Sequence, residues 1–244
     1  MTERSTSAST SLKKGGGRNC SPPENATPRA WRSSCEDIRR NAFPEPFFRR
    51  DAAEVARDLL GACVRSTVDG TEVVGVLVET EAYVGPHDPA SHAAERIGRT
   101  PRNRSMYGPP GQAYVYRSHG IHWCLNVVTG GEGFPAAVLV RGLDLIRGVE
   151  IARSRRGGRE PLCAGPGRLC QALGVTGELD GHSLGEPPLQ LLQGWTVPRE
   201  AVAVSGRVGI RKAADWPLRF YLRGHPQVSR GPREMDPVPL FRDS

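Results

Sequence analysis

The segment that most constrains the fold is the apolar run TEVVGVLVETEAY at residues 71–83, which stops at Gly85-Pro86. Its hydrophobic residues recur with a period of two, which is typical of a β-strand. One predicted face therefore carries an apolar row followed by two carboxylates. Alternation predicts that this face holds Val73, Leu77, Glu79, Glu81 and Tyr83, and that the other face holds Val74, Val76, Val78 and Thr80.

Strands and helices are predicted along the rest of the chain without a regular βαβ period. The first predicted elements are a helix from Asp51 to Gly61, strands at 62–68 and 71–81 joined by an Asp69-Gly70 turn, and a short helix that begins at Asp88-Pro89 and carries His92. Later elements are two strands in QAYVYRSHGIHWCLNVV, a strand running into a helix in AAVLVRGLDLIRG, a helix from Pro166 in CAGPGRLCQALG, and a strand in LRFYLRG.

This mixture predicts an α+β fold, a single mixed domain with a curved antiparallel sheet and surrounding helices. The domain is predicted at residues 42–230. Residues 1–41 are rich in Ser, Thr, Gly, Pro and Arg and have no apolar periodicity, so a disordered basic tail is expected there. Residues 231–244 are predicted to be a C-terminal tail.

The charge of the chain points to an acidic partner. The formal net charge is +7, although ten Lys and Arg against five acids lie within residues 1–50, where a solvated tail explains them equally well. A run from Arg96 to Gly131 holds five arginines and no acid. Nucleic acid is therefore the favoured partner, ahead of anionic metabolites.

Several kinds of chemistry have few candidate residues. Lys13, Lys14 and Lys212 are the three lysines of the chain, so a lysine-based covalent mechanism has almost no support. The six cysteines form no C-x-x-C pair, and they are interpreted as reduced, buried or incidental thiols. His119 and His122 lack a third ligand at metal-site spacing, which makes a zinc site improbable.

The charged and aromatic residues each have a plain structural interpretation beside a functional one. Glu79 and Glu81 are consistent with solvent-exposed carboxylates on an edge strand. They are also consistent with a general base and a neighbouring carboxylate that takes no part in the reaction. The aromatic residues Tyr83, Tyr114, Tyr116 and Trp123 are consistent with a buried hydrophobic core. Their interleaving with Arg and His is also consistent with a stacking pocket for a nucleobase. The loop TPRNRSMYGPPG at 100–111 fits a solvated loop or a phosphate clamp.

Motifs in one order connect these residues to a known family. They are ETEAY at 79–83, the nine-residue step from Tyr83 to His92, TPRNR at 100–104, AYVY at 113–116, CLN at 124–126, and the closing RVGI and PLRFYLRG. Together the motifs, from about Phe43 to about Val228, resemble the alkyladenine (3-methyladenine) DNA glycosylase family. The resemblance is specific because several motifs recur in order at near-family spacing.

The resemblance implies roles for individual residues. Glu81 takes the position of the general base that activates water, while Arg141 and the backbone of Val208 help to hold that water. The flipped purine is framed by the base-pocket positions, namely Tyr83, Ala90, His92, Tyr116 and Asn126, with Asn126 disfavouring the exocyclic amine of guanine. His119 takes the intercalating position, where some members place tyrosine, and Arg102 and Arg104 are expected to contact DNA.

The implied activity is that of a monofunctional DNA glycosylase of base excision repair that hydrolyses the N-glycosidic bond of alkylated or deaminated purines. The resemblance implies duplex DNA as partner, no metal or other cofactor, and a monomer. No stretch approaches the roughly 18 consecutive apolar residues of a membrane helix, so no membrane partner is expected. The expected location is the bacterial cytoplasm with the nucleoid, or the nucleus of a eukaryote. Two alternatives stay open: a non-catalytic nucleic-acid-binding module, and a metal-assisted hydrolase built on His92, His119 and His122.

Overall fold

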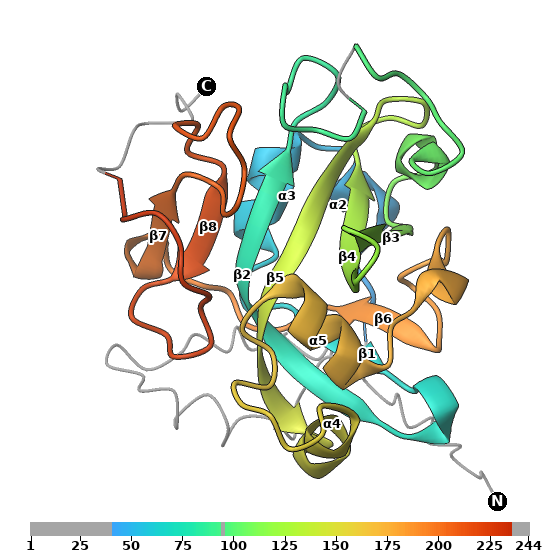
Figure 1. Cartoon of the computed structure of the whole chain (residues 1–244), viewed down its shortest axis with the longest axis vertical. Coiled ribbons are helices and arrows are strands. Elements are labelled where there is room, and N and C mark those ends of the chain that lie inside the picture. Colours follow the sequence, from blue (N-terminus) through green and yellow to red (C-terminus); the bar gives the residue numbers. More distant parts are fainter. Residues whose placement is uncertain (1–40, 94–95, 236–244) are drawn as a thin grey trace, which may run out of the picture.

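The computed structural model describes residues 41–93 and 96–235 (Figure 1). The described residues form one eight-stranded sheet of antiparallel pairs in the order β3-β4-β5-β2-β1-β6, with β8 pairing both β2 and β7. This arrangement confirms the predicted α+β class with a curved antiparallel sheet. The strands are β1 (Cys63–Ser66), β2 (Val73–Tyr83), β3 (Ala113–Ser118), β4 (His122–Thr129), β5 (Ala136–Arg147), β6 (Leu189–Leu192), β7 (Val202–Ser205) and β8 (Arg219–Leu222).

Short helices pack around this sheet. The α-helices are α2 (Glu45–Phe48), α3 (Ala52–Asp58), α4 (Val149–Arg155) and α5 (Pro166–Leu173), and the 3-10 helices are η2 (Val68–Gly70), η3 (Arg104–Tyr107), η4 (Gly177–Leu179) and η5 (Arg199–Ala201). Asp51 caps α3 as predicted, because its side chain accepts a hydrogen bond from the Ala53 N–H at 2.7 Å. The Thr80 hydroxyl donates to the Ala56 carbonyl at 2.8 Å and ties α3 to β2.

The predicted Asp69-Gly70 turn is present at the tip of the β1–β2 pair. Both residues have positive φ angles, 56° and 68°, as a tight two-residue hairpin turn requires. The register pairs Ser66 with Val73, so β1 ends at Ser66, before the predicted end at 68, and β2 runs from Val73 to Tyr83 instead of the predicted 71–81. The turn therefore lies where the sequence placed it, between shorter strand ends.

The predicted alternation along β2 is only partly correct. The pairing of β2 with β5 has register shifts between Val74 and Gly75 and again between Leu77 and Thr80. Leu77 and Val78 both pack into the main core, whereas Val74 and Val76 belong to a separate small cluster. A bulge adds a residue and changes which face the following side chains occupy, so Val78 does not share a face with Val74.

Other differences concern segments whose local pattern was ambiguous. The predicted helix from Asp88 to His92 is a series of turns, and β6 and β7 were not predicted. Within the segment assigned to the C-terminal tail, the Met235 N–H donates to the Val204 carbonyl at 2.8 Å. The boundaries at residues 41 and 230 stay predictions, and residues 1–40 lie outside the described part. None of the described helices is long and apolar enough to span a membrane.

Candidate active site

A cavity of about 300 Å³ opens where the ends of β2, β3, β4 and β5 meet the loop after β7. Eight of the site positions that the resemblance implied line it: Tyr83, Ala90, His92, Tyr116, His119, Asn126, Arg141 and Val208. Glu81 lies directly behind this lining, because its carboxylate contacts Val208, Arg141 and Tyr83. Residues from four strands and three loops thus meet at one site.

The Glu81 carboxylate is fully buried and held by donors on both oxygens. Its Oε1 accepts from the Val208 N–H at 2.6 Å, and its Oε2 lies 3.4 Å from Arg141 Nη1. The Tyr83 hydroxyl donates to Oε2 over 3.3 Å. These contacts fix the orientation of the carboxylate at the edge of the cavity.

Burial and charge act in opposite directions on the pKa of Glu81. Burial raises this pKa above that of an ordinary glutamate, and the nearby Glu79 carboxylate raises it further. The Arg141 guanidinium and the Val208 N–H lower it, but they do not fully offset the effect of burial. Such a carboxyl is well suited to accept a proton, since its protonated form is less unfavourable than in water.

Arg141 lies between the two glutamates. Its Nε is 3.1 Å from Glu79 Oε1 and 3.3 Å from Glu81 Oε1, and its Nη2 donates to the Ser229 hydroxyl at 3.2 Å. Only 6% of Arg141 is exposed. A guanidinium held at several atoms cannot follow the substrate, so it acts as a fixed positive charge beside Glu81.

Glu79 differs from the surface carboxylate that one interpretation of the sequence allowed. It is fully buried and also accepts from Arg219 Nε at 2.8 Å and from the Ser229 N–H at 2.7 Å. All of its hydrogen-bonding capacity is therefore used inside the protein. Glu79 holds Arg141 in position. A substitution of Glu79 would therefore also disturb the surroundings of Glu81.

Three aromatic rings form one wall of the cavity. The His92 and Tyr116 rings are 4.4 Å apart at 78°, and Tyr114 stacks on Tyr116 at 5.3 Å. His92 Nδ1 lies 3.1 Å from the Tyr114 hydroxyl. Burial, and then the charge of Arg102, lower the pKa of His92, so its neutral form is favoured. Of the aromatic residues that the sequence suggested for a stacking pocket, Tyr114 lines the cavity and Trp123 does not, whereas Met106 lines it and was not predicted.

Tyr83 enters the cavity from the end of β2, and a buried ion pair supports it. The Arg207 guanidinium lies 4.6 Å from the centre of the Tyr83 ring and forms two hydrogen bonds, at 2.5 and 2.9 Å, with Asp88. Arg207 also donates to the Ala82 carbonyl. Asp88 accepts from the Ala90 N–H as well, so this pair fixes the loop that carries Ala90 and His92. No local sequence pattern connects Asp88 with Arg207.

Asn126 is buried on β4 at the cavity wall. Its Nδ2 donates to the Tyr114 carbonyl at 2.9 Å across the β3–β4 pair. This hydrogen bond fixes the plane of the side-chain amide. A base that enters the cavity therefore meets an amide of fixed orientation.

The turn between β3 and β4 extends beyond the cavity. His119 is exposed there and has a φ of 48°, a left-handed conformation that is uncommon outside glycine. Ile121, two residues further on, is 65% exposed, which is unusual for a large apolar side chain in the described ranges. His119 was predicted from the sequence but Ile121 was not, since a single exposed apolar residue has no sequence signal.

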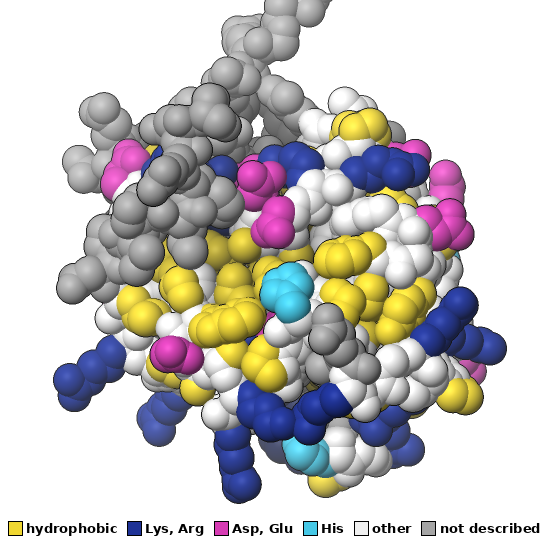
Figure 2. All heavy atoms as spheres, turned by 90° about the horizontal axis from the view of Figure 1, so that it is seen from above, with side chains coloured by type: hydrophobic (Ala, Val, Ile, Leu, Met, Phe, Trp, Pro, Cys, Tyr) yellow, Lys and Arg dark blue, Asp and Glu magenta, His cyan; other side chains and the backbone are white. Residues whose placement is uncertain are grey.

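Arg102 and Arg104 are exposed and do not line the cavity. Arg102 donates to the Arg117 carbonyl at 2.8 Å and lies 5.8 Å from the Tyr116 ring centre. The buried Asn103 between them anchors the loop through bonds to the His92 and Gly98 carbonyls. The five arginines of the acid-free run are all exposed, and Figure 2 shows Arg and Lys side chains around the lower edge of one face.

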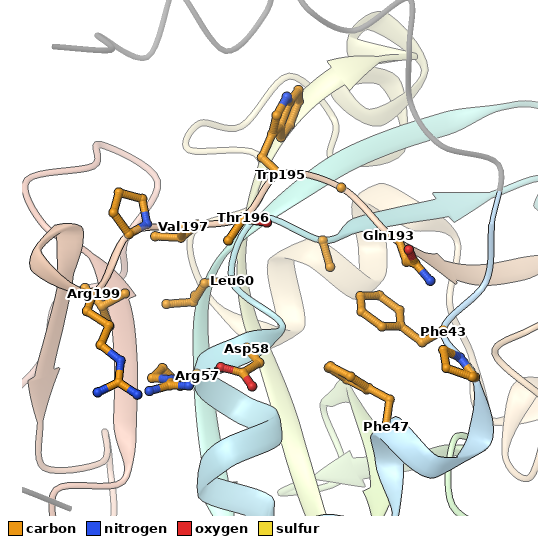
Figure 3. A pocket seen from close by; sticks show the side chains of 15 residues that line it. Phe43, Phe47, Arg57, Asp58, Leu60, Gln193, Trp195, Thr196, Val197 and Arg199 are labelled. Atoms are coloured by element: carbon orange, nitrogen blue, oxygen red, sulfur yellow. Dashed lines mark hydrogen bonds and ion pairs between the residues drawn. The ribbon is translucent and has the colours of Figure 1, made fainter. Parts of the chain in front are cut away.

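A separate cavity of about 680 Å³ lies between α2, α3 and residues 193–199 (Figure 3). Its charged groups include Arg57 and Asp58, which pair with each other at 2.5 Å. None of the predicted site residues lines it. Among the described residues, no group of three or more His, Cys, Asp or Glu side chains is arranged to hold a metal ion.

The chain is similar to known proteins of one family. Residues 46–226 match the family model described as methylpurine-DNA glycosylase. Relatives from Agrobacterium fabrum and Methanoculleus marisnigri are 49% and 48% identical over 191 and 193 residues, which is 77% of this chain and 92% and 98% of theirs. A relative from Rhizobium meliloti is 50% identical over 187 residues, 75% of this chain and 94% of its own. All three carry the provisional name 3-methyladenine DNA glycosylase. The chain belongs to the methylpurine-DNA glycosylase family.

Proposed function

We propose that this protein is a monofunctional DNA glycosylase that binds a flipped, alkylated or deaminated purine in the 300 Å³ cavity and hydrolyses its N-glycosidic bond. The observation that carries this proposal is the buried Glu81 carboxylate, held by Arg141 and the Val208 N–H beside a cavity walled by aromatic rings. Flat rings stack on a base, and a fixed carboxylate activates water. The product is an abasic site.

In the proposed reaction, the bond between C1′ and the purine nitrogen breaks, and its electron pair leaves with the base. A water oxygen bonds to C1′ as positive charge develops on the sugar, and the proton of that water passes to Glu81. Arg141 keeps Glu81 ionised before attack, and the Val208 N–H orients it. Lys212, the lysine within residues 41–93 and 96–235, is exposed and does not line the cavity, which supports water over a lysine amine as the nucleophile.

Binding requires the target nucleotide to leave the base stack, which costs a few kcal/mol and costs least for damaged or mispaired bases. We expect the extruded purine to lie between Tyr83 on one side and the His92 and Tyr116 rings, which meet edge to face, on the other. The fixed amide of Asn126 is expected to disfavour the exocyclic amine of guanine. We expect the exposed His119, together with Ile121, to occupy the space that the base vacates.

The raised pKa of Glu81 predicts how excision depends on pH. The reaction needs ionised Glu81, so the single-turnover rate should rise with pH through a pKa above the ordinary glutamate value of about 4.3. The contribution of Glu81 to the stability of the fold depends on pH in the opposite direction. Protonated Glu81 stabilises the fold fully below that ordinary value, and this contribution is lost as the pH rises through the raised pKa. A rate profile with no acid limb above the ordinary value would contradict the assignment.

The proposed activity is tested with four matched duplexes that contain 3-methyladenine, 7-methylguanine, hypoxanthine or ethenoadenine. The wild-type protein is expected to convert at least one of them to a strand with an abasic site, detected by cleavage at that position in alkali. The undamaged duplex serves as the control. Binding to all duplexes without any abasic product would support the alternative of a non-catalytic binding module.

A further inference from the structure

The 227–235 segment follows β8 and packs behind the groups that hold Glu81. It runs back past β7, where the Met235 N–H donates to the Val204 carbonyl at 2.8 Å. The segment extends beyond residue 230, the predicted end of the domain. None of its residues lines the candidate active-site cavity, so any effect on the reaction has to pass through the residues that it contacts.

Ser229 connects this segment to the buried ion pairs. Its N–H donates to Glu79 Oε2 at 2.7 Å, and its hydroxyl donates to Glu79 Oε1 at 2.7 Å. The same hydroxyl oxygen accepts from Arg141 Nη2 at 3.2 Å, and the Ser229 carbonyl accepts from Arg219 Nη2 at 2.7 Å. Every polar group of this half-buried serine thus contacts a charged side chain, and hydrogen bonds to charged groups are stronger than those between neutral groups.

The Ser229 hydroxyl completes the contacts of the Arg141 guanidinium. Arg141 Nε lies 3.1 Å from Glu79 Oε1 and 3.3 Å from Glu81 Oε1, and its Nη1 lies 3.4 Å from Glu81 Oε2. The contact with Ser229 engages the third nitrogen, Nη2. A planar guanidinium that is held at all three nitrogens cannot rotate without losing one of these contacts. The orientation of Arg141 toward Glu81 therefore depends in part on Ser229.

The same segment also packs against the backbone donor of Glu81. A Cβ atom at Gly231 would approach Val208 Cγ2 to 2.6 Å and Arg219 Nη1 to 2.7 Å, so there is space only for glycine at this contact. The Val208 N–H donates to Glu81 Oε1 at 2.6 Å. The 227–235 segment therefore contacts both Arg141 and Val208, the two groups that orient the Glu81 carboxylate.

The charge of Arg141 matters most for the ionisation of Glu81. The groups that face Glu81 come from four strands: Glu79 and Tyr83 on β2, Cys124 on β4, Arg141 on β5 and Arg219 on β8. Burial raises the pKa of Glu81, and Arg141 is the group that counteracts this effect most. Attraction between opposite charges weakens with distance, so the position of Arg141 determines how readily Glu81 ionises.

We propose that Ser229 is a positioning residue for base excision, whose hydroxyl holds Arg141 at the distance from Glu81 that keeps this carboxylate ionised for attack. The inference rests on the proposed function, because it takes Glu81 as the general base. Ser229 does not line the cavity and acts through Arg141. Its backbone contacts with Glu79 and Arg219 are available to any residue at this position, so the hydroxyl is the group that the proposal concerns.

The first test compares Ser229→Ala with Ser205→Ala. Ser229→Ala loses the hydroxyl and keeps the backbone contacts, whereas Ser205→Ala loses a buried hydroxyl that accepts from Arg219 at 3.1 Å. Single-turnover excision is measured across the acid and neutral pH range. We expect the acid limb of Ser229→Ala to move to higher pH by about 0.5 to 1 unit and its plateau rate to fall about tenfold, because Arg141 is held less firmly beside Glu81. Ser205→Ala should keep the wild-type profile, and coincident profiles of the two variants would overturn the proposal.

Two further substitutions at the same position separate the hydroxyl from the shape of the side chain. Ser229→Thr keeps a hydroxyl and should return the acid limb to its wild-type position. A limb of Ser229→Thr that moves as far as that of Ser229→Ala would contradict the proposed role of the hydroxyl. If Ser229→Ala does not fold, Ser229→Cys takes its place, because a thiol fills the space and is a weak acceptor. Its acid limb should also move to higher pH, and an unmoved limb would refute the proposal.

A second measurement reports on Glu81 without using excision. Urea unfolding is followed over a pH series for proteins with and without Glu81→Gln, in the wild-type and the Ser229→Ala backgrounds. Protonated Glu81 stabilises the fold at low pH, and this contribution is lost as the pH rises through its raised pKa. The stability difference caused by Glu81→Gln should therefore level off at a higher pH in the Ser229→Ala background.

The two measurements distinguish failure of this inference from failure of the proposed function. If the stability difference shifts as expected but the wild-type protein excises none of the four damaged bases, the proposed function fails, and Ser229 still controls the ionisation of Glu81. If the wild-type protein excises a damaged base, and neither the acid limb nor the stability difference moves in Ser229→Ala, this inference alone fails.

Discussion

We expect Glu81→Gln to abolish release of a modified purine while its affinity for duplex DNA stays within a few fold of wild type. Glutamine has nearly the same shape and its carbonyl oxygen can still accept from the Val208 N–H. It cannot take a proton from water, and a positioned general base contributes about 10²- to 10⁴-fold to a rate. Loss of its negative charge also removes the group that offsets positive charge on the sugar.

Single-turnover excision with enzyme in excess measures this change, and fluorescence anisotropy measures binding to the same duplex. The fold provides an internal control, because burial makes ionised Glu81 unfavourable for stability. The denaturant midpoint of Glu81→Gln at neutral pH should therefore equal or exceed that of the wild-type protein. A variant that excises normally would sink the assignment of Glu81 as the base.

We expect Glu79→Gln to destabilise the protein by about 3 to 5 kcal/mol, the usual cost of removing one partner from a buried ion pair. Glu79 is fully buried and contacts Arg141, Arg219 and Ser229. Without its charge, Arg219 and Arg141 stay buried with fewer compensating negative groups. Urea unfolding followed by circular dichroism measures the change in the free energy of unfolding.

Glu72→Gln is the matched control for that substitution. Glu72 pairs with Arg65 at 2.7 Å, but the two side chains are 37% and 39% exposed. Exposed pairs of this kind contribute about 0 to 1 kcal/mol, so Glu72→Gln should change stability by no more than that. Equal effects of Glu79→Gln and Glu72→Gln would mean that the buried ion pairs of Glu79 contribute no more to the free energy of unfolding than the exposed pair of Glu72.

The two glutamates show where sequence reasoning reaches its limit. Alternation placed Glu79 and Glu81 on one face of a strand, and both do contact Arg141. The pattern could not tell them apart, because their difference comes from partners far along the chain. Glu79 contacts Arg219 and Ser229, and Glu81 contacts the backbone of Val208. The resemblance of ETEAY to a family motif selected Glu81.

Strands and turns were predictable where a local signal dominates. Asp69-Gly70 favours one type of turn, and the apolar run of β2 predicts a strand. The segment AAVLVRGLDLIRG was predicted to pass from strand to helix, but β5 continues to Arg147 and the helix α4 begins only at Val149. The bulges in β2 have no such signal, so the prediction of which face of the sheet holds Val78 was wrong. The strands β6 and β7 were not predicted, because each contains too few residues to give a clear apolar pattern.

The Asp88 segment shows how a tertiary contact overrides a local preference. Asp88-Pro89 is a favourable helix start, and the Asp88 side chain does accept from the Ala90 N–H as a cap would. The same carboxylate is engaged by the fully buried Arg207, and the segment forms turns instead of a helix. This ion pair joins residues 119 positions apart, so the sequence around Asp88 could not predict it.

The central claim is that the ionised carboxylate of Glu81 converts water into the nucleophile. The most direct measurement is the single-turnover rate of hypoxanthine release across the acid and neutral pH range, for the wild-type protein and Glu81→Gln. A neutral base is the strictest substrate, because it does not leave as readily as a cationic purine. The account predicts a wild-type rate that rises with pH to a plateau and a variant rate about 10³-fold lower with no acid limb. A variant rate within tenfold of wild type, or one that keeps the same acid limb, would contradict it.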